Sequence, residues 1–474
     1  MDFLIYDVIF LAFFLIVSSI FLYIRRKNLK REGLLYLYRT KWGIKLIDYI
    51  GNKYKRTLKA LSYVSVTLGY LLMIGIFYLI YTIVKIYVFN PSIVRAIKVP
   101  PIMPLIPYLP QVFKLEFLPP FYFTYWILII ALIAITHEMA HGIFAAHNKI
   151  KIKTTGFGFF PFFLPIFLAA FVELDEKIMA KRKTFSQLAV LGAGTFANVL
   201  TAILFFIVLL IFFSMAFTPS GVTFDTYATS TIAIVGISSI NNVQLNQTSY
   251  NSVLEIMDEE GLNEIIVENN VYFATKEMLE NQKDSDNVLI YHSAPAIKEN
   301  LSSIITEINE IKIDSIDKLI EELAKYDVRD EITVKTMMDG GVAEKTLVLE
   351  EHPGIPGTAW LGIGFVSQER AGILGKIMKV VSFKEPHVYY EPKFDGLSVF
   401  IYNLLWWVVI ISISVALINM LPVGIFDGGR FFYLTVLALT KSEKTAKRLF
   451  VFSTQFFIFI LFLLLIFWGI SFIR

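Results

Sequence analysis

The chain contains six uninterrupted apolar runs of about 20 residues or more, and this feature limits its fold more than any other. An α-helix of about 20 residues crosses the roughly 30 Å hydrocarbon core of a bilayer. The composition is 56% hydrophobic and only 18% charged, whereas a soluble domain carries more charge. We therefore predict a polytopic α-helical membrane protein with about six transmembrane helices. The runs lie near residues 3–23, 62–89, 121–146, 187–217, 398–421 and 449–472.

Lys and Arg gather in alternate loops between these runs. About a dozen lie in residues 24–60, and further groups lie in 147–186 and 440–448. Cytoplasmic loops of membrane proteins carry an excess of Lys and Arg, so we expect these three loops in the cytoplasm. The N-terminus and residues 218–396 are then extracytoplasmic. The first run has no small-residue cleavage site behind it, so it is expected to remain as a helix.

A shorter apolar stretch, residues 155–172, is flanked by Lys and Arg on both sides and interrupted by Pro161 and Pro165. Such a segment is expected to enter and leave the membrane by the same face, as a re-entrant loop or as short strands. Membranes tolerate irregular backbone only where protein or a water-filled cavity satisfies its polar groups. The stretch therefore suggests an internal aqueous site. The chain has no cysteine, which excludes disulfides, Cys-based metal sites and Cys nucleophiles.

Residues about 225–370 differ from the rest of the chain, with 26 acidic and 10 basic residues. Strand-like runs alternate there with charged amphipathic helices, which predicts a soluble α+β insertion. The better-defined half has a helix expected at 315–326 and a strand at 331–341. This order of elements resembles a PDZ-type domain of the kind inserted in membrane proteases. Such domains bind peptide termini by adding a strand to a sheet edge, although a spacer or size filter above the membrane is an equal alternative here.

The third apolar run carries His137-Glu138-Met139-Ala140-His141. The i, i+4 spacing places both imidazoles on one helix face, where they can share a tetrahedral metal ion. In the H-E-x-x-H pattern the Glu takes a proton from water that the metal activates. The alternative is a set of polar residues that satisfy one another inside the helix bundle. That alternative must accommodate three ionisable groups at membrane depth, each of which costs about 2.5–3.5 kcal/mol without a partner.

A third metal ligand must come from the same membrane depth as the two histidines. The fifth run ends at a helix-breaking segment with Pro422 and a Gly pair, and Asp427 in this segment is the candidate ligand. An ordinary Asp-Gly turn is the alternative for this residue. The fourth run begins at the same depth and carries Asn198, which could donate to the oxyanion of amide hydrolysis. An interhelical hydrogen bond is the alternative for Asn198.

Four motifs together resemble the site-2 protease family of intramembrane metalloproteases, in the order in which that family shows them. They are H-E-x-x-H-G at 137–142, FVELDE at 171–176, G-x-x-x-N at 194–198 and N-x-x-P-x-x-x-x-D-G-G at 419–429. The resemblance implies a Zn²⁺ ion held by His137, His141 and Asp427. It also implies Glu138 as the base, Asn198 as a group that stabilises the transition state, and regulated cleavage of transmembrane substrates.

We therefore divide the chain into four domains: 1–120 with N-terminal helices and a basic loop, 121–217 with the first part of a catalytic core, 218–396 with the PDZ-like insertion, and 397–474 with the rest of the core. The predicted function is an intramembrane zinc endopeptidase with its active site near the cytoplasmic leaflet. Its expected partners are membrane-protein substrates, the lipid bilayer and a peptide terminus at the PDZ-like domain, but no nucleic acid. The alternatives are a zinc protease that trims soluble or lipid-modified termini, and a non-enzymatic transporter or scaffold.

Overall fold

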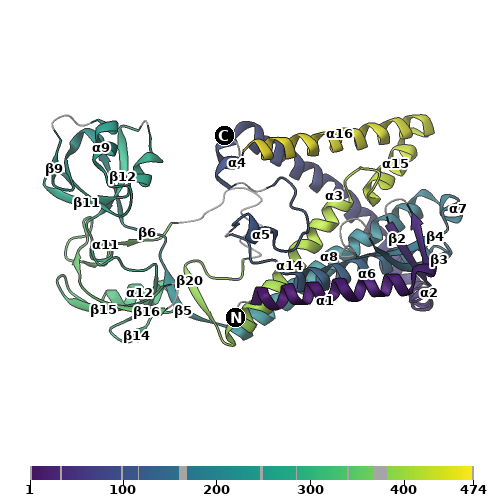
Figure 1. Cartoon of the computed structure of the whole chain (residues 1–474), viewed down its shortest axis with the longest axis horizontal. Coiled ribbons are helices and arrows are strands. Elements are labelled where there is room, and N and C mark those ends of the chain that lie inside the picture. The colour runs from purple at the N-terminus through teal and green to yellow at the C-terminus, as the bar shows by residue number, and fades with distance from the viewer. Residues whose placement is uncertain are drawn as a thin grey trace. The chain divides into compact units, whose positions relative to one another are not determined.

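The computed structural model describes residues 3–32, 35–97, 100–115, 117–159, 168–245, 249–283, 285–338, 341–366 and 382–471. The chain forms two compact units (Figure 1). The membrane unit comprises Met1–Phe212 and Val399–Arg474, and the inserted unit comprises Phe213–Ser398.

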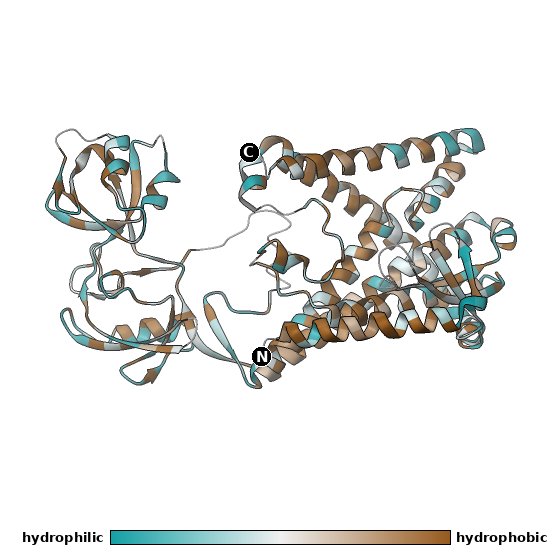
Figure 2. Ribbon diagram, viewed as in Figure 1, coloured by the Kyte–Doolittle hydropathy of each residue, from teal (hydrophilic) through white to brown (hydrophobic). Residues whose placement is uncertain are grey.

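Six helices in the described residues are long and apolar enough to cross a membrane, as predicted. Figure 2 shows that hydrophobic residues dominate along them. Helices α3 and α16 begin several residues before the predicted runs, because their first turns carry Lys, Arg or Glu that a hydropathy pattern does not include. The six helices are α1 (Phe3–Ile24), α3 (Lys55–Phe89), α6 (Phe123–His147), α8 (Thr184–Ala216), α14 (Asp395–Asn419) and α16 (Glu443–Ile470).

Shorter helices connect these spans. Helix α14 ends at Asn419 and α15 begins at Asp427, so the helix break predicted around Pro422 is confirmed. Glycine allows the first turn of α15 to pack tightly, because a Cβ on Gly428 would lie 2.3 Å from the carbonyl carbon of Met420. The other short helices of this unit are η1 (Arg26–Asn28), α2 (Ile44–Lys53), α4 (Pro91–Ile97), α5 (Leu109–Val112) and α7 (Glu176–Ala180).

A four-stranded antiparallel sheet of order β1-β2-β3-β4 belongs to the membrane unit. The segment predicted as a re-entrant loop or strands forms β3 (Ile152–Phe159) and β4 (Leu168–Leu174), and residues 160–167 of that prediction lie outside the described residues. No strand is predicted in residues 24–60, which carry the first group of Lys and Arg. Strands β1 (Leu29–Glu32) and β2 (Leu35–Thr40) nevertheless extend the sheet, and Thr40 pairs with Thr155.

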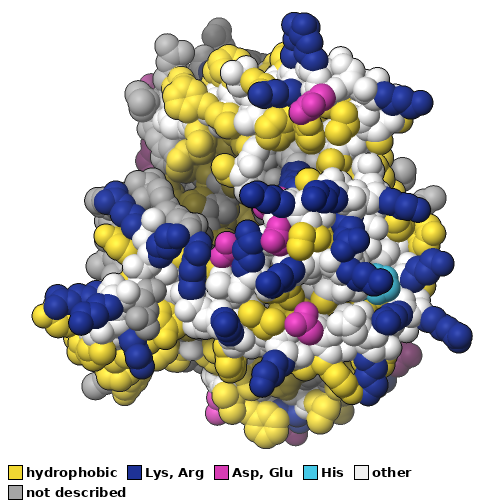
Figure 3. Space-filling model, turned by 90° about the vertical axis from the view of Figure 1, so that its right-hand side faces the viewer, with side chains coloured by type: hydrophobic (Ala, Val, Ile, Leu, Met, Phe, Trp, Pro, Cys, Tyr) yellow, Lys and Arg dark blue, Asp and Glu magenta, His cyan; other side chains and the backbone are white. Residues whose placement is uncertain are grey.

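The basic loops lie at one end of the membrane unit. This end carries the β1–β4 sheet, α2 and α7 (Figure 1), and Figure 3 shows many Lys and Arg side chains on it. The arrangement agrees with the predicted grouping of the basic loops. The side of the membrane that this end faces stays a prediction.

The inserted unit is an α+β domain built on two six-stranded sheets. The first sheet has the order β7-β12-β11-β10-β8-β9. The second has the order β16-β15-β13-β5-β20, with β14 paired to β13. Two short pairs, β17 with β18 and β19 with β6, complete it.

The elements of the inserted unit begin and end as follows. The strands are β5 (Phe217–Thr223), β6 (Thr226–Tyr227), β7 (Thr229–Ala233), β8 (Ile237–Ile240), β9 (Val243–Gln244), β10 (Asn263–Val267), β11 (Asn270–Ala274), β12 (Asn287–His292), β13 (Ile304–Ile308), β14 (Ile311–Lys312), β15 (Glu331–Met338), β16 (Gly341–Val348), β17 (Glu350–Glu351), β18 (Ala359–Trp360), β19 (Ile363–Gly364) and β20 (Val388–Pro392). The helices are η3 (Ile234–Gly236), α9 (Tyr250–Ile256), α10 (Lys276–Glu280), α11 (Pro295–Lys298) and α12 (Ile316–Leu323).

The inserted unit contains the same arrangement twice, a repeat that was not predicted from the sequence. In each copy a strand ends at Ile, Asn follows in the turn, a short strand returns, and a helix and a two-strand hairpin come after it. These elements are β8, β9, α9, β10 and β11 in the first copy, and β13, β14, α12, β15 and β16 in the second.

The Asn of each copy makes the same contact to the backbone of the first hairpin strand. The Asn241 side-chain oxygen accepts from the Glu264 N–H at 2.9 Å, and the Asn309 oxygen accepts from the Thr333 N–H at 2.8 Å. Both Asn residues have positive φ, at 47° and 46°. Asn adopts this conformation more readily than most residues, which explains why Asn occupies both turns. The sheet-rich insertion is consistent with the predicted PDZ-like domain, and it contains this arrangement of strands and helix twice.

Asp7 of α1 caps the N-terminus of α6. Its side chain is only 1% exposed and accepts hydrogen bonds from the Phe123 N–H at 2.7 Å and the Thr124 N–H at 2.9 Å. The Tyr108 hydroxyl donates to the same carboxylate at 2.7 Å. The first N–H groups of a helix have no partner within the helix, and their partial positive charge favours a carboxylate. Helix α1 is thereby fixed to α6, the helix that carries the H-E-x-x-H motif.

We predict that Asp7→Ala lowers the stability of the protein. The substitution leaves the buried N–H of Phe123 without an acceptor, at a cost of about 1–3 kcal/mol, and leaves the half-buried donors of Tyr108 and Thr124 without one at a smaller cost. The measurement is the midpoint of thermal unfolding in one detergent, with Ser19→Ala on the exposed side of α1 as the control. Equal midpoints for the two variants would contradict the capping role.

Candidate metal centre

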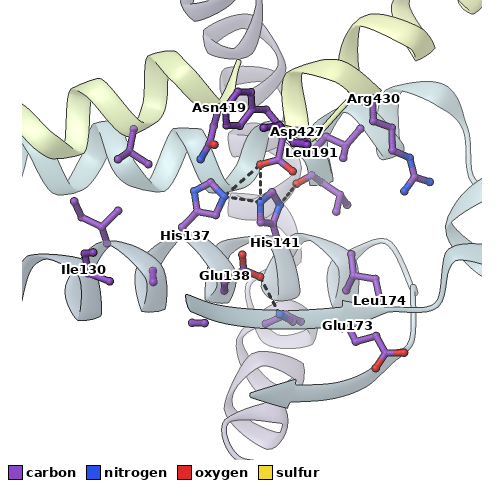
Figure 4. Close-up of a pocket in the computed structure, with 18 of the residues that line it drawn as sticks. Ile130, His137, Glu138, His141, Glu173, Leu174, Leu191, Asn419, Asp427 and Arg430 are labelled. Carbon is purple, nitrogen blue, oxygen red and sulfur yellow. Dashed lines mark hydrogen bonds and ion pairs between the residues drawn. The ribbon is translucent and has the colours of Figure 1, made fainter. Parts of the chain in front are cut away.

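Three side chains that are distant in sequence meet at one point of the membrane unit (Figure 4). His137 and His141 come from α6 and Asp427 from the first residue of α15. The two Nε2 atoms lie 3.0 Å apart, and Asp427 Oδ2 lies 3.3 Å from Nε2 of His137 and 3.2 Å from Nε2 of His141. The structure therefore brings together the three residues that the sequence predicts as metal ligands.

Helical geometry positions the two imidazoles. Residues four apart lie one above the other on a helix, so His137 and His141 project from the same face of α6. Each residue is 8% exposed, and the face on which they lie packs against α8. Burial among apolar helices keeps both rings in place and restricts water to the cavity described below.

Helix α8 contacts both imidazoles with residues spaced four apart. The Nδ1 of His141 lies 2.7 Å from the Val190 carbonyl oxygen, and Nδ1 of His137 lies 3.1 Å from Nδ2 of Asn198. Gly194 lies between these contacts. A Cβ at this position would lie 2.4 Å from Nε2 of His141 and 2.5 Å from Nε2 of His137, so only Gly leaves the point between the two rings free.

The donor atoms fit a divalent metal. Because a carbonyl oxygen only accepts, Nδ1 of a neutral His141 carries the hydrogen and Nε2 presents a lone pair. That lone pair faces the second Nε2 and a carboxylate oxygen, which repel one another unless a cation lies between them. Zinc bonds of about 2.0–2.1 Å in tetrahedral geometry separate ligand atoms by about 3.3 Å. The observed spacings of 3.0–3.3 Å match this value.

Glu138 lies beside the two histidines and faces the cavity (Figure 4). Its carboxylate accepts a hydrogen bond from the Val172 N–H of β4 at 2.8 Å. Strand β4 therefore fixes one oxygen of Glu138. The FVELDE motif at 171–176 overlaps the end of this strand, but nothing in the residue types indicated a backbone contact to Glu138.

A cavity of about 1080 Å³ opens at the metal centre. It is lined by Glu138 and the three ligands, by Ala170, Val172 and Leu174 of β4, and by Asn419 at the end of α14. Charged residues line it as well, among them Glu173, Glu176 and Arg430. Arg430 of α15 forms an ion pair with Glu176 of α7, and Glu173 of β4 lies 3.4 Å from Arg39 of β2, which does not itself line the cavity. The cavity is large enough to hold an extended segment of polypeptide together with water.

Among the described residues β4 is an edge strand of its sheet, and its open edge faces this cavity. Strand β3 pairs with one side of β4, and the Val172 N–H points to the other side, toward Glu138. Because strand residues alternate, the backbone groups of Ala170 and Leu174 point the same way as those of Val172. An unpaired strand edge is a template for pairing with another chain.

Comparison with known proteins supports a hydrolase of the membrane. The sequence profile described as Peptidase family M50 matches residues 125–279 and 373–464, which together are more than half of the chain. The matched segments contain the His pair, Glu138, Asn198 and Asp427, and they leave out the second PDZ-like copy. No curated protein matches the chain. The chain therefore belongs to peptidase family M50, the site-2 protease family of membrane metalloproteases.

Proposed function

We propose that this protein is an intramembrane zinc endopeptidase that cleaves transmembrane segments of other membrane proteins. The observation that carries the proposal is the position of the three ligand atoms, which meet between membrane-spanning helices and open onto a cavity of about 1080 Å³. A protease for soluble substrates does not need an active site that lies between membrane-spanning helices. We further propose that the N-terminus and the inserted unit are extracytoplasmic and that the centre lies near the cytoplasmic leaflet.

His137, His141 and Asp427 would hold the zinc ion. When bound, zinc polarises the scissile carbonyl and lowers the pKa of water toward neutrality. Glu138 accepts a proton from the attacking water and delivers it to the leaving amine, since a carboxylate that has taken a proton can return it. The Val172 N–H keeps this carboxylate oriented toward the cavity. Burial by α8 and α15 excludes bulk water from the reacting groups.

A transmembrane helix is protected from hydrolysis because its amides are hydrogen-bonded and shielded. Pairing with the open edge of β4 would hold a substrate in extended form and expose one peptide bond to the centre. The stretch at 155–172, which contains parts of β3 and β4, would thereby present the substrate to the centre. Binding of a peptide terminus by the PDZ-like modules is a further proposal, supported by their arrangement of strands and helix.

The first test concerns the base. Glu138→Gln keeps an acceptor for the Val172 N–H but cannot take a proton, so cleavage of a model single-span protein should fall by about 100-fold or more. Zinc content, measured by elemental analysis of the purified protein, should stay at the wild-type level. Wild-type cut sites mapped by mass spectrometry should lie within the apolar segment. Cuts outside it would favour the enzyme that trims soluble termini.

The second test concerns the third ligand. Asp427→Ala should lose most of the zinc, because two imidazoles alone cannot complete the ligand set of a stable site. Asp395→Ala, an exposed Asp in the first turn of α14, is the matched control and should keep it. Retention of zinc by Asp427→Ala would indicate a different third ligand, as in the trimming alternative. Absence of metal from the wild type would instead favour a transporter or scaffold.

The third test concerns the strand edge. Ala170→Pro removes one outward N–H from β4, and a proline is tolerated at a sheet edge because that N–H does not pair within the sheet. We expect cleavage to fall by about tenfold, near the effect of losing one hydrogen bond of about 1.4 kcal/mol, with zinc content unchanged. Ala170→Val keeps the N–H and serves as the control. Equal cleavage by both variants would contradict substrate pairing at β4.

A further inference from the structure

Asn198 lies on the opposite side of His137 from the metal-binding point. The residue is fully buried at 0% exposure, and it is not among the residues that line the cavity. Its Nδ2 lies 3.1 Å from Nδ1 of His137, whereas Nε2 of the same ring faces Asp427. Among the described residues, Oδ1 of Asn198 has no hydrogen-bond partner.

The chemistry of the ring determines which amide atom belongs at this contact. A histidine that binds metal through Nε2 presents its lone pair there and carries its hydrogen on Nδ1. This Nδ1–H needs an acceptor, and an NH₂ group cannot be one. Amide oxygen and nitrogen atoms have nearly the same size, so rotation of the amide by 180° fits the same space. The rotation gives the Nδ1–H an acceptor and gives the buried Oδ1 a partner.

The neighbouring histidine follows the same rule. Nδ1 of His141 donates to the Val190 carbonyl oxygen at 2.7 Å, which leaves Nε2 for the metal. Val190, Gly194 and Asn198 are spaced four apart on α8 and so lie on one face of that helix. One face of α8 therefore carries a hydrogen-bond acceptor for each imidazole, and its glycine leaves room for a metal ion between the two rings.

We propose that Asn198 is a positioning residue for the metal ligand His137, which its Oδ1 orients through the Nδ1–H. This role differs from the transition-state contact that the family resemblance implies for Asn198. It rests on the metal centre of the proposed function, but not on the nature of the substrate. A substrate carbonyl in the cavity lies on the Nε2 side of His137, where Asn419 rather than Asn198 lines the wall.

The experiment measures metal binding without substrate. Asn198→Leu removes the acceptor at similar volume, and Asn198→Asp keeps an acceptor oxygen. Thr201→Val is the matched control, because Thr201 is 7% exposed on the same helix and its hydroxyl donates only to the Ala197 carbonyl. Zinc dissociation constants are measured by competition with a chelator. The absorption spectrum of the Co²⁺-substituted full-length protein reports ligand geometry.

We expect Asn198→Leu to raise the zinc dissociation constant by about 10–100-fold and to alter the Co²⁺ spectrum, as is typical of lost outer-shell partners. Asn198→Asp should bind zinc no more weakly than the wild type, and Thr201→Val should match it. Wild-type affinity and an unchanged Co²⁺ spectrum in Asn198→Leu, together with a lower kcat, would overturn the proposal in favour of a transition-state contact.

Equal loss of zinc from Asn198→Leu and Asn198→Asp, but not from Thr201→Val, would also overturn the proposal, since it would indicate a packing role. Failure of the proposed function gives a different result. A wild type that binds zinc but cuts no transmembrane substrate would contradict intramembrane proteolysis. The comparison of zinc affinities would still decide the role of Asn198, because zinc binding by each variant is measured without substrate.

Discussion

Two imidazole nitrogens and one carboxylate oxygen lie within 3.3 Å of one another between apolar helices. The positions of three helices in the membrane unit bring these atoms together. Such a cluster is unfavourable without a cation, because its members repel one another and lie away from bulk water. Helix α6 supplies two ligands through its own periodicity. Helix α15 supplies the third only because the chain breaks after Asn419 and turns back tightly. Helix α8 approaches closely because residue 194 has no side chain.

The membrane-spanning part of the fold could be predicted from sequence because each apolar run is as long as a helix must be to cross the bilayer. The sheet could be predicted only in part. Strands β3 and β4 lie in a stretch with an unusual Gly, Phe and Pro pattern, but β1 and β2 lie in a basic segment that reads as a loop. The pairing of Thr40 with Thr155 joins residues far apart in the chain, and no local pattern encodes such a contact. The repeat of the inserted unit was missed because only the short pattern I-x-x-I-N recurs, at 237–241 and 305–309. The contacts that define the two turns join the Asn side chain to the backbone of a later strand, and no local pattern encodes them.

The residues of the metal centre could likewise be predicted from sequence only in part. His137 and His141 follow from their spacing on one helix. Asp427 required a further step, since only the direction of each span showed that it lies at the depth of the histidines. The contact between Val172 and Glu138 was out of reach, because a backbone N–H leaves no signature in residue type. The orientation of Asn198 was out of reach as well, because a short motif names the residue but not the atom that it contacts.

The cap that Asp7 provides has a consequence for the order in which the molecule is assembled. Asp7 belongs to α1, and its donors belong to a segment synthesised about 100 residues later. During that interval the carboxylate has none of the hydrogen-bond partners that offset its burial in the finished protein. The first span therefore reaches its final packing only after the third has been made, because the third supplies the donors that the Asp7 carboxylate accepts.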